Sequence, residues 1–280
     1  MEEVEALSTK EIIRKLRSFG VDFNRKQFLE DVRWFYSACE LADHWKTIYT
    51  ITLGWFDENF VWMAAIVLWQ RLAPGVITSE QLDEMMQRGY DFKEEGKVKE
   101  SCNLWLEVWE HLKKRFSPDM SDIEDTRSVF SGMQSLYNWC QDLEMELFNA
   151  GVEDATFYER RIEYCHDFYR MFPDTDSQVI ENMMRGEAES YFFIGEKEKG
   201  EEAFKKMIEV FPESAWGYIH WGDMYWLFMR NEKLPPLDYD KAEKIFRMGL
   251  AKATSDREVI LDRLRSLEEK KKEKVRQDKK

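Results

Sequence analysis

Residues that interrupt helices are scarce in this chain of 280 residues, which contains 6 Pro and 13 Gly. Because such residues mark turns and strand ends, their scarcity favours long helices over many short strands. Closely spaced cysteines are absent as well, so neither a disulfide framework nor a zinc cluster is expected. The sequence therefore predicts free thiols in a reducing cytoplasm at Cys39, Cys102, Cys140 and Cys165.

Long apolar runs and catalytic motifs are also missing. The longest apolar run, Phe60 to Trp69, has 10 residues, about half of what a bilayer requires. The acidic start, Met1 to Glu5, has no apolar segment behind it, which argues against a secretion signal. The chain has no glycine-rich phosphate loop, no Gly-x-Ser-x-Gly elbow and no metal-ligand spacing among its histidines. We therefore expect a cytoplasmic protein that is not an enzyme, binds no membrane and carries no metal or other cofactor.

Negative charge dominates, with a formal net charge of −14. An acidic surface repels phosphate backbones, so general nucleic-acid binding is disfavoured. The exceptions are a Lys-rich tail, residues 268–280, and a basic cluster near the N-terminus that could mimic a DNA-binding hairpin. Phe23, Phe28 and Leu29 favour instead a structural hairpin that packs on the next helix. The basic cluster consists of Lys10, Arg14, Lys15, Arg17, Arg25 and Lys26.

Apolar residues recur at helical spacing between clear start and stop signals, and no segment alternates as a strand would. The sequence therefore predicts an all-α protein of about 13 helices without a sheet. We expect an apolar, buried helix from Asn59 to Ala73 and a single helix from Ile123 to Asn149. Helix starts with the capping-box pattern, in which two side chains satisfy free backbone donors, occur at Ser8, Thr78, Ser121 and Ser255.

The last third of the chain contains a repeated pattern. A small residue followed by an aromatic one recurs after 34 residues, first at Ala188 and Tyr191 and then at Gly222 and Tyr225. A weaker copy has Gly89 at the small position. A 34-residue period of two helices is typical of stacked repeats that share a core. The small residue is expected where the second helix of a pair crosses the first, because a larger side chain would push the helices apart.

These copies resemble tetratricopeptide repeats, most clearly over Met184–Pro212 and Tyr218–Gly249. The resemblance implies an α-α superhelix of antiparallel helix pairs, a tetratricopeptide-like solenoid. On this basis we expect one continuous array in three parts. These are an N-terminal helical cluster over residues 1–76, repeats with a capping helix over 77–267, and the charged tail over 268–280.

Three aromatic-rich stretches carry a second resemblance: Trp62–Trp69, Leu104–Trp109 and Leu136–Glu144. From Ile12 through Leu264 the chain is similar to a group of bacterial helical proteins that often carry a SEC-C zinc motif. This similarity implies a cytoplasmic bacterial protein. The zinc motif itself, a cluster of closely spaced cysteines, is absent, so no zinc-dependent role is expected.

In repeats of this kind the first helices line a groove, and aromatics beside Arg, Asn and His could hold an extended peptide or a helix there. The alternative is that some of these aromatics are covered and only pack. Glu189 and Asp223 would repel a carboxylate at close range, so a basic or apolar segment is the expected ligand. The predicted groove residues are Asn182, Arg185, Glu189, Phe192, Phe193, Trp216, Ile219, His220, Asp223 and Trp226.

The function favoured by these patterns is a non-catalytic adaptor or scaffold that binds a protein or peptide. Two alternatives stay open: a regulatory protein that responds to a peptide, and a nucleic-acid-associated factor that uses the basic cluster or the Lys-rich tail. The sequence assigns neither an oligomeric state nor a role to the polar, proline-bearing insertion Asn231–Asp238.

Overall fold

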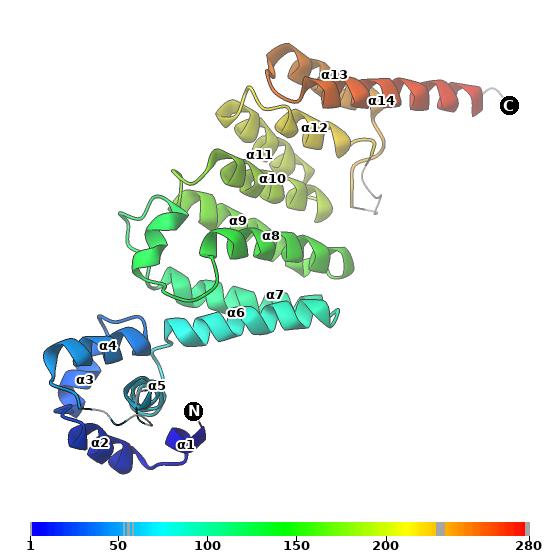
Figure 1. Ribbon diagram of the computed structural model, residues 1–280. Helices are drawn as coiled ribbons and strands as arrows, with labels where there is room; N and C mark the ends of the chain where they lie inside the picture. The colour runs from blue at the N-terminus through cyan, green and yellow to red at the C-terminus, as the bar shows by residue number, and fades with distance from the viewer. Residues whose placement is uncertain (1, 53, 55–56, 58, 228–232, 278–280) are drawn as a thin grey trace. The chain divides into compact units, whose positions relative to one another are not determined.

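The computed structural model describes residues 2–52, 54, 57, 59–227 and 233–277. Within these residues the chain forms fourteen α-helices and one 3-10 helix and contains no strand, which confirms the all-α prediction. The chain divides into two compact units (Figure 1). The N-terminal unit comprises Met1–Ser117 with Thr126–Ser135, and the C-terminal unit comprises Pro118–Asp125 with Leu136–Lys280.

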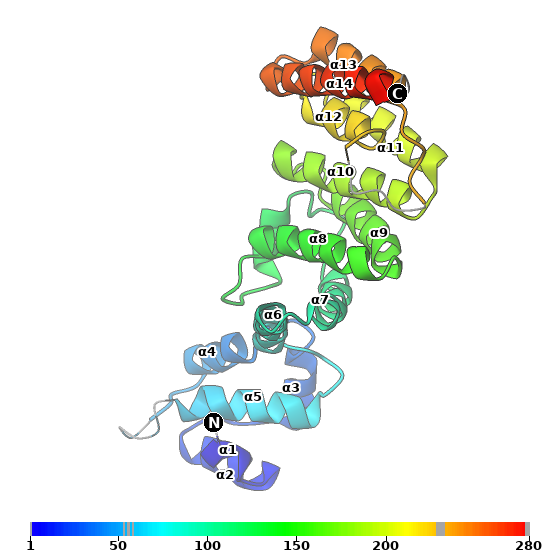
Figure 2. The same ribbon diagram turned by 90° about the vertical axis from the view of Figure 1, so that its right-hand side faces the viewer.

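The N-terminal unit is built around one apolar helix, α5 (Phe60–Leu72). Ala64, Leu68 and Trp69 of this helix are completely buried, as predicted for a helix that is apolar on all sides. Figure 2 shows α5 between α4 on one side and α1 and α2 on the other, and all three contact it. The helices before α5 are α1 (Glu2–Glu5), α2 (Thr9–Ser18), α3 (Arg25–Asp31) and α4 (Ala38–Ile48).

The N-terminal unit also contains a pair of longer helices, α6 (Ser79–Glu94) and α7 (Val98–Lys113). Gly89 stands where α7 crosses α6, and a Cβ at this position would come within 1.9 Å of Nε1 of Trp105. The same indole nitrogen donates to the carbonyl oxygen of Met86 at 2.9 Å. The close approach of the two helices therefore requires glycine here, as the repeat pattern predicts.

Polar contacts fasten the α6–α7 pair to the start of α4. The carboxylate of Glu80 accepts hydrogen bonds from the amide of Cys39 at 3.1 Å and from the hydroxyl of Ser37. The amide of Ser79 donates to the carbonyl oxygen of Tyr36 at 2.7 Å. These contacts join the α6–α7 pair to the first helices, and the pair belongs to the same compact unit as they do.

The C-terminal unit is a succession of seven helices, each of which contacts the next along the chain (Figure 1). Such a succession is typical of a helical repeat array. Gly222 again stands at a helix crossing, where a Cβ would come within 2.2 Å of Cε1 of Phe246. The helices are α8 (Leu136–Glu153), α9 (Thr156–Met171), α10 (Ser177–Phe193), α11 (Lys197–Val210), α12 (Trp216–Asp223), α13 (Tyr239–Lys252) and α14 (Arg257–Gln277).

The prediction of a single helix from Ile123 to Asn149 is wrong. The chain forms a 3-10 helix, η1 (Ile123–Ser128), followed by an irregular segment that ends where α8 begins. This segment buries Val129 and Phe130 and folds the Phe130 ring over Gly132, where a Cβ would meet Cζ at 2.3 Å. Burial of these two side chains outweighs the helical periodicity of the local sequence.

Two of the four predicted capping boxes form with both reciprocal hydrogen bonds, between Ser8 and Glu11 and between Thr78 and Gln81. At Ser121 the prediction is wrong, because the carboxylate of Asp125 accepts from the Ser121 amide at 3.0 Å. The prediction at Ser255 is wrong as well. There α14 begins only at Arg257, after Asp256 has adopted a φ of 49° in the left-handed region.

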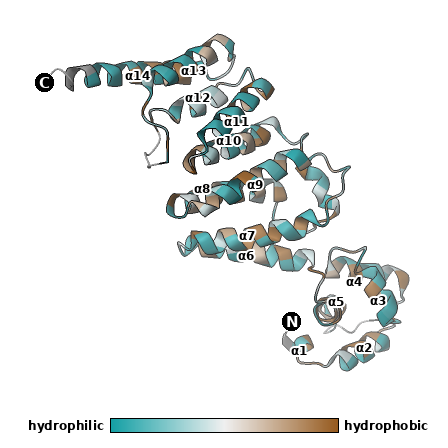
Figure 3. Ribbon diagram, turned by 180° about the vertical axis from the view of Figure 1, so that it is seen from behind, coloured by the Kyte–Doolittle hydropathy of each residue, from teal (hydrophilic) through white to brown (hydrophobic). Residues whose placement is uncertain are grey.

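The last helix, α14, closes the C-terminal unit and is mainly hydrophilic, as expected of a capping helix (Figure 3). It continues into the predicted Lys-rich tail, whose residues 278–280 lie outside the described residues, as do Asn231 and Glu232 of the insertion. Within the described part of the chain, no helix is long and apolar enough to cross a membrane. Three tail lysines form ion pairs: Lys270 with Glu273 at 2.9 Å, Lys271 with Asp240 at 2.6 Å and Lys272 with Glu268 at 2.7 Å.

Candidate functional site

A pocket of about 500 Å³ lies in the C-terminal unit between α10, the start of α12 and the loop before α14. Its volume falls within the range of roughly 300–1,000 Å³ that is usual for ligand pockets. The wall includes three of the predicted groove residues, Asn182, Arg185 and Trp216. The structure therefore brings these three side chains together at one site.

The α10 wall of this pocket is a polar stripe at helical spacing. Gln178, Glu181, Asn182 and Arg185 follow one another at positions i, i+3, i+4 and i+7, so they share one helix face. The start of the helix is fixed at the edge of the pocket, because the carboxylate of Asp176 accepts from the Gln178 amide at 2.9 Å. This stripe positions one carboxylate, one amide and one guanidinium on the same wall.

The opposite wall comes from Trp216, the first residue of α12, and from the loop before α14. The Trp216 side chain is 40% exposed and offers a flat aromatic surface. The loop is held by the amide of Ser255, which donates to the carbonyl oxygen of Glu213 at 3.3 Å. This contact places Asp256, in its left-handed conformation, at the rim of the pocket.

Two buried polar atoms on the pocket wall lack hydrogen-bond partners among the described residues: Oε1 of Glu181 and Nε of Arg185. Burial raises the pKa of Glu181, although a hydrogen bond with Ser214 and the charge of Arg185 oppose the rise. Each buried group left without a partner costs on the order of 1–3 kcal/mol. The site is therefore suited to a ligand that supplies a donor for Glu181 and an acceptor for Arg185.

Arg185 is also the outer end of a chain of polar and charged side chains that runs into the core. Nε2 of His220 lies 3.5 Å from Nη1 of Arg185, and Nδ1 of His220 lies 2.8 Å from Oε1 of Glu189. Arg161 lies 3.4 Å from Glu189 and donates through Nε to Glu144 at 2.8 Å. Burial opposes ionisation of Glu189, but the hydrogen bond and charge of His220 and the charge of Arg161 lower its pKa to about 2. Glu189 and His220 thus support the site from beneath it.

Three predicted groove residues are part of the core, so their assignment to the groove is wrong. Phe192, Phe193 and Ile219 are at most 5% exposed. The Phe192 ring covers Gly200 on α11, and the Phe193 ring stacks on Tyr158 of α9 at 4.9 Å between centroids. Because α10 contacts helices on both sides, only a narrow stripe of its surface stays open.

Asp223 and Trp226 also have internal partners and do not line the pocket. Nε of Arg263 donates to both carboxylate oxygens of Asp223, at 3.1 and 3.0 Å, and Nε1 of Trp226 donates to Oδ1 at 2.9 Å. Asp223 is 3% exposed and Glu189 is 4% exposed, and each is paired with a cation. The repulsion of a ligand carboxylate that the sequence suggested for these two residues therefore does not apply.

The sequence prediction misses Glu181 and Asp256, the two carboxylates that line the pocket. The spacing of Gln178, Glu181, Asn182 and Arg185 is a signal that could have found Glu181. No comparable signal identifies Asp256, because its place depends on contacts of its neighbour Ser255, whose hydroxyl donates to the carbonyl oxygen of Glu213, 42 residues away.

Two side chains of the N-terminal basic cluster have partners inside their own unit. Lys15 pairs with Asp57 at 2.8 Å, and Nη2 of Arg17 donates to the carbonyl oxygen of Phe23 at 3.0 Å. The rings of Phe23 and Phe28 each lie 6.2 Å from Trp45 on α4. These contacts support the structural hairpin that the sequence favours over a DNA-binding one.

Metal-ligating side chains do not gather in the part of the chain that the structure describes. No group of three or more His, Cys, Asp or Glu residues there could hold a metal ion. The four cysteines are free thiols, three of them buried. The lining of the α10–α12 pocket offers hydrogen-bonding groups, charged groups and an aromatic ring.

Comparison of the chain with models of known protein families, with curated proteins and with solved structures found no match. The resemblances to tetratricopeptide repeats and to SEC-C-associated proteins stay predictions.

Proposed function

We propose that the protein is a non-catalytic adaptor that binds an extended peptide segment with a basic side chain in the α10–α12 pocket. The observation that carries this proposal is the pair of unpartnered buried atoms, Oε1 of Glu181 and Nε of Arg185, on one wall of a 500 Å³ pocket. A peptide supplies both missing partners, because it carries backbone carbonyl oxygens and, at a Lys or Arg residue, a charged donor.

The ligand's basic side chain lies across the Trp216 ring with its charged end toward Glu181 and Asp256. A cation over an indole face gains about 0.5–1 kcal/mol at an exposed site and more when water is excluded. A backbone carbonyl oxygen of the ligand accepts from Nε of Arg185, and the amide of Asn182 is available to the next peptide group. The two acidic residues against one Arg favour a positively charged side chain over a negative one.

The remaining charge of the protein supports the same choice of ligand. A net charge of −14 attracts basic segments at long range and repels acidic ones, in a salt-dependent way. The buried contacts from Arg185 through His220 to Glu189 hold the pocket in place before a ligand arrives. Pre-formed sites bind with a smaller ordering cost on the protein side.

The test is a titration with fluorescent peptides that are acetylated and amidated and differ at one central position in a Gly-Ser background. We expect peptides with Arg or Lys at this position to bind and the peptide with Glu to bind at least tenfold more weakly. Trp216→Ala should weaken binding of the Arg peptide by roughly tenfold or more. Glu181→Gln should weaken binding of the Arg peptide without unfolding the protein.

The control is Trp34→Ala, which removes an 82% exposed tryptophan of the N-terminal unit. This variant should bind the Arg peptide as the unchanged protein does. Equal affinity for the Arg and Glu peptides, or an unchanged affinity in Trp216→Ala with intact helix content, would overturn the proposal.

A further inference from the structure

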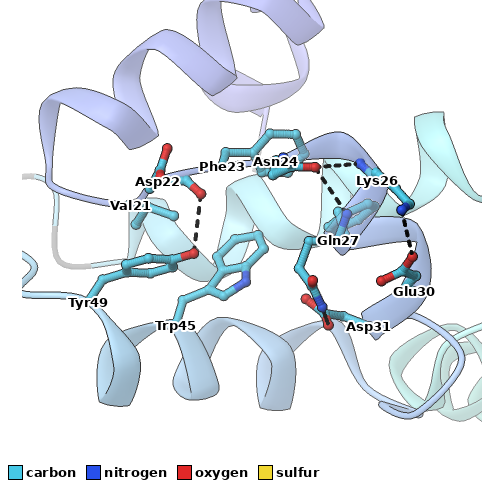
Figure 4. Close-up of a pocket in the computed structure, with 11 residues that line it drawn as sticks. Val21, Asp22, Phe23, Asn24, Lys26, Gln27, Glu30, Asp31, Trp45 and Tyr49 are labelled. Carbon is cyan, nitrogen blue, oxygen red and sulfur yellow. Dashed lines mark hydrogen bonds and ion pairs between the residues drawn. The ribbon is translucent and has the colours of Figure 1, made fainter.

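A second pocket, of about 300 Å³, lies in the N-terminal unit at the surface of α3 and α4 (Figure 4). Its lining combines three acidic side chains with the edges of aromatic rings. The volume is at the lower end of the usual range for ligand sites, so it fits one or two residues of a peptide rather than a large molecule. The lining includes Asp22, Lys26, Gln27, Asp31, Trp45 and Tyr49.

The charge of this pocket is negative and only partly compensated. Lys26 lies 3.8 Å from Glu30, with both side chains largely in solvent. The carboxylate of Asp31 accepts from Nε2 of Gln27 at 2.7 Å. This amide donor is neutral, so it does not compensate the charge of Asp31. Among the described residues, the carboxylates of Asp22 and Asp31 are not paired with a Lys, Arg or His side chain. Two such carboxylates in the lining of one small pocket favour a cationic ligand over a neutral or anionic one.

A hydrogen-bond donor faces the same pocket. Trp45 is 4% exposed, and its ring is fixed by contacts with Phe23 and Phe28. Figure 4 shows the nitrogen edge of this ring turned toward Gln27 and Asp31. Its indole N–H has no acceptor among the described residues. The hydroxyl of Tyr49 is already used, because it donates to the carbonyl oxygen of Asp22 at 3.2 Å.

We propose that this pocket binds the free amino terminus of a peptide. The α-ammonium group lies against Asp31, beside the nitrogen edge of Trp45, and the carbonyl oxygen of the first residue accepts from Nε1 of Trp45 (Figure 4). An amino terminus joins these two functions through one carbon atom, so both fit within a pocket of this size. A simple amine has no acceptor for the indole N–H of Trp45. A neutral amide has no positive charge for the carboxylates.

This inference is independent of the peptide site on α10 and α12, because it concerns a different unit and a different end group. The capped peptides used to test that site have no free amino terminus. A failure of one proposal therefore leaves the other unaffected.

The test follows the indole N–H signal of Trp45 in a ¹H–¹⁵N spectrum, assigned with the variant Trp45→Phe. The probe is glycinamide, which carries an ammonium group and a carbonyl oxygen on adjacent carbons. We expect a saturable shift of the Trp45 signal with glycinamide and none with N-acetylglycinamide at equal concentration. Ethylamine, a cation without an acceptor, should shift the Trp45 signal much less.

Asp31→Asn should raise the dissociation constant for glycinamide about tenfold, and Asp22→Asn should raise it less, because Asp22 lies on the other side of the Trp45 ring (Figure 4). The matched control is Glu84→Gln, which removes an exposed carboxylate on α6 in the same unit and should leave binding unchanged. The proposal is overturned if the Trp45 signal of the unchanged protein does not move, or if N-acetylglycinamide moves it equally. It is also overturned if the two Asp variants, folded by their spectra, bind as tightly as Glu84→Gln.

Discussion

Oε1 of Glu189 on α10 lies 2.8 Å from Nδ1 of His220 on α12, so one buried contact joins the two helices that carry the candidate site. Glu189 is 4% exposed, and its other carboxylate oxygen lies 3.4 Å from Arg161 on α9. Because Arg185 lies against the same His220, the charge of Glu189 supports the geometry of the pocket wall.

The first prediction concerns pH and Glu189. Its pKa is about 2 in the folded protein against an ordinary 4.5, because the contacts with His220 and Arg161 outweigh burial. A lowered pKa means that the stabilisation is complete above the ordinary value and is lost as pH falls toward 2. Across this window the free energy of unfolding should fall more in the unchanged protein than in Glu189→Gln, by on the order of 2–3 kcal/mol.

Urea unfolding at a series of pH values measures this difference between the two proteins. The exposed Glu84 provides the control, because Glu84→Gln should keep the pH dependence of the unchanged protein. If Glu189→Gln lost stability at acid pH as steeply as the unchanged protein does, the assigned role of Glu189 would be wrong.

The second prediction concerns Arg161, which is 2% exposed and contacts both Glu144 and Glu189. Arg161→Met should destabilise the protein by roughly 3–5 kcal/mol, because it leaves the buried carboxylate of Glu144 without its cation and removes one of the partners of Glu189. Adding Glu144→Gln and Glu189→Gln to this variant should recover part of the loss. Chemical unfolding of the single and triple variants tests this, and a triple variant less stable than Arg161→Met would contradict it.

The third prediction concerns the helix crossing at Gly222. Gly222→Ala places a Cβ 2.2 Å from Cε1 of Phe246, and overpacking of this kind costs about 1–3 kcal/mol. Gly75→Ala is the matched control, because a Cβ there meets no atom within 4 Å. Thermal unfolding should show a clear loss for Gly222→Ala and little change for Gly75→Ala. Equal melting temperatures in the two variants would refute the close contact.

The fourth prediction concerns the pH dependence of peptide binding in the α10–α12 pocket. Burial raises the pKa of Glu181, so this carboxylate takes up a proton at a higher pH than an ordinary glutamate does. Affinity for the capped Arg peptide should therefore begin to fall above pH 4.5 as the solution is acidified. Fluorescence anisotropy with Glu181→Gln should show weaker binding without this fall. A fall of the same size in Glu181→Gln would exclude Glu181 as the titrating group.

Sequence patterns predict the helices well where the interactions that form them lie between residues close together in the sequence. The capping boxes at Ser8 and Thr78 form because both partners lie within one helical turn. Gly89 and Gly222 stand at helix crossings because the repeat spacing places a small residue there. The same approach fails between Ile123 and Leu136, where the burial of Phe130 replaces a helix by an irregular segment.

The candidate site was only partly predictable for a related reason. Helical spacing and the repeat pattern bring Asn182, Arg185 and Trp216 to one pocket, but the same pattern also assigns Phe192 and Ile219 to the groove. Whether an aromatic residue on a first helix is covered depends on the helices packed against it. That information is not present in the spacing of one helix.

By itself, the sequence determined that the chain is all-helical, where most helices begin and which residues must be small at the helix crossings. These features follow from backbone hydrogen bonding and from the spacing of residues along one helix. Only the tertiary structure decided which stripe of α10 stays open and which charges are compensated. The partners of Glu189 and Asp223 lie on other helices, at Arg161 and Arg263. Asp256 reaches the pocket only because the backbone near Glu213 holds its loop there. Burial and ion pairing between distant segments depend on the packed chain, whereas helix formation depends on its neighbours in sequence.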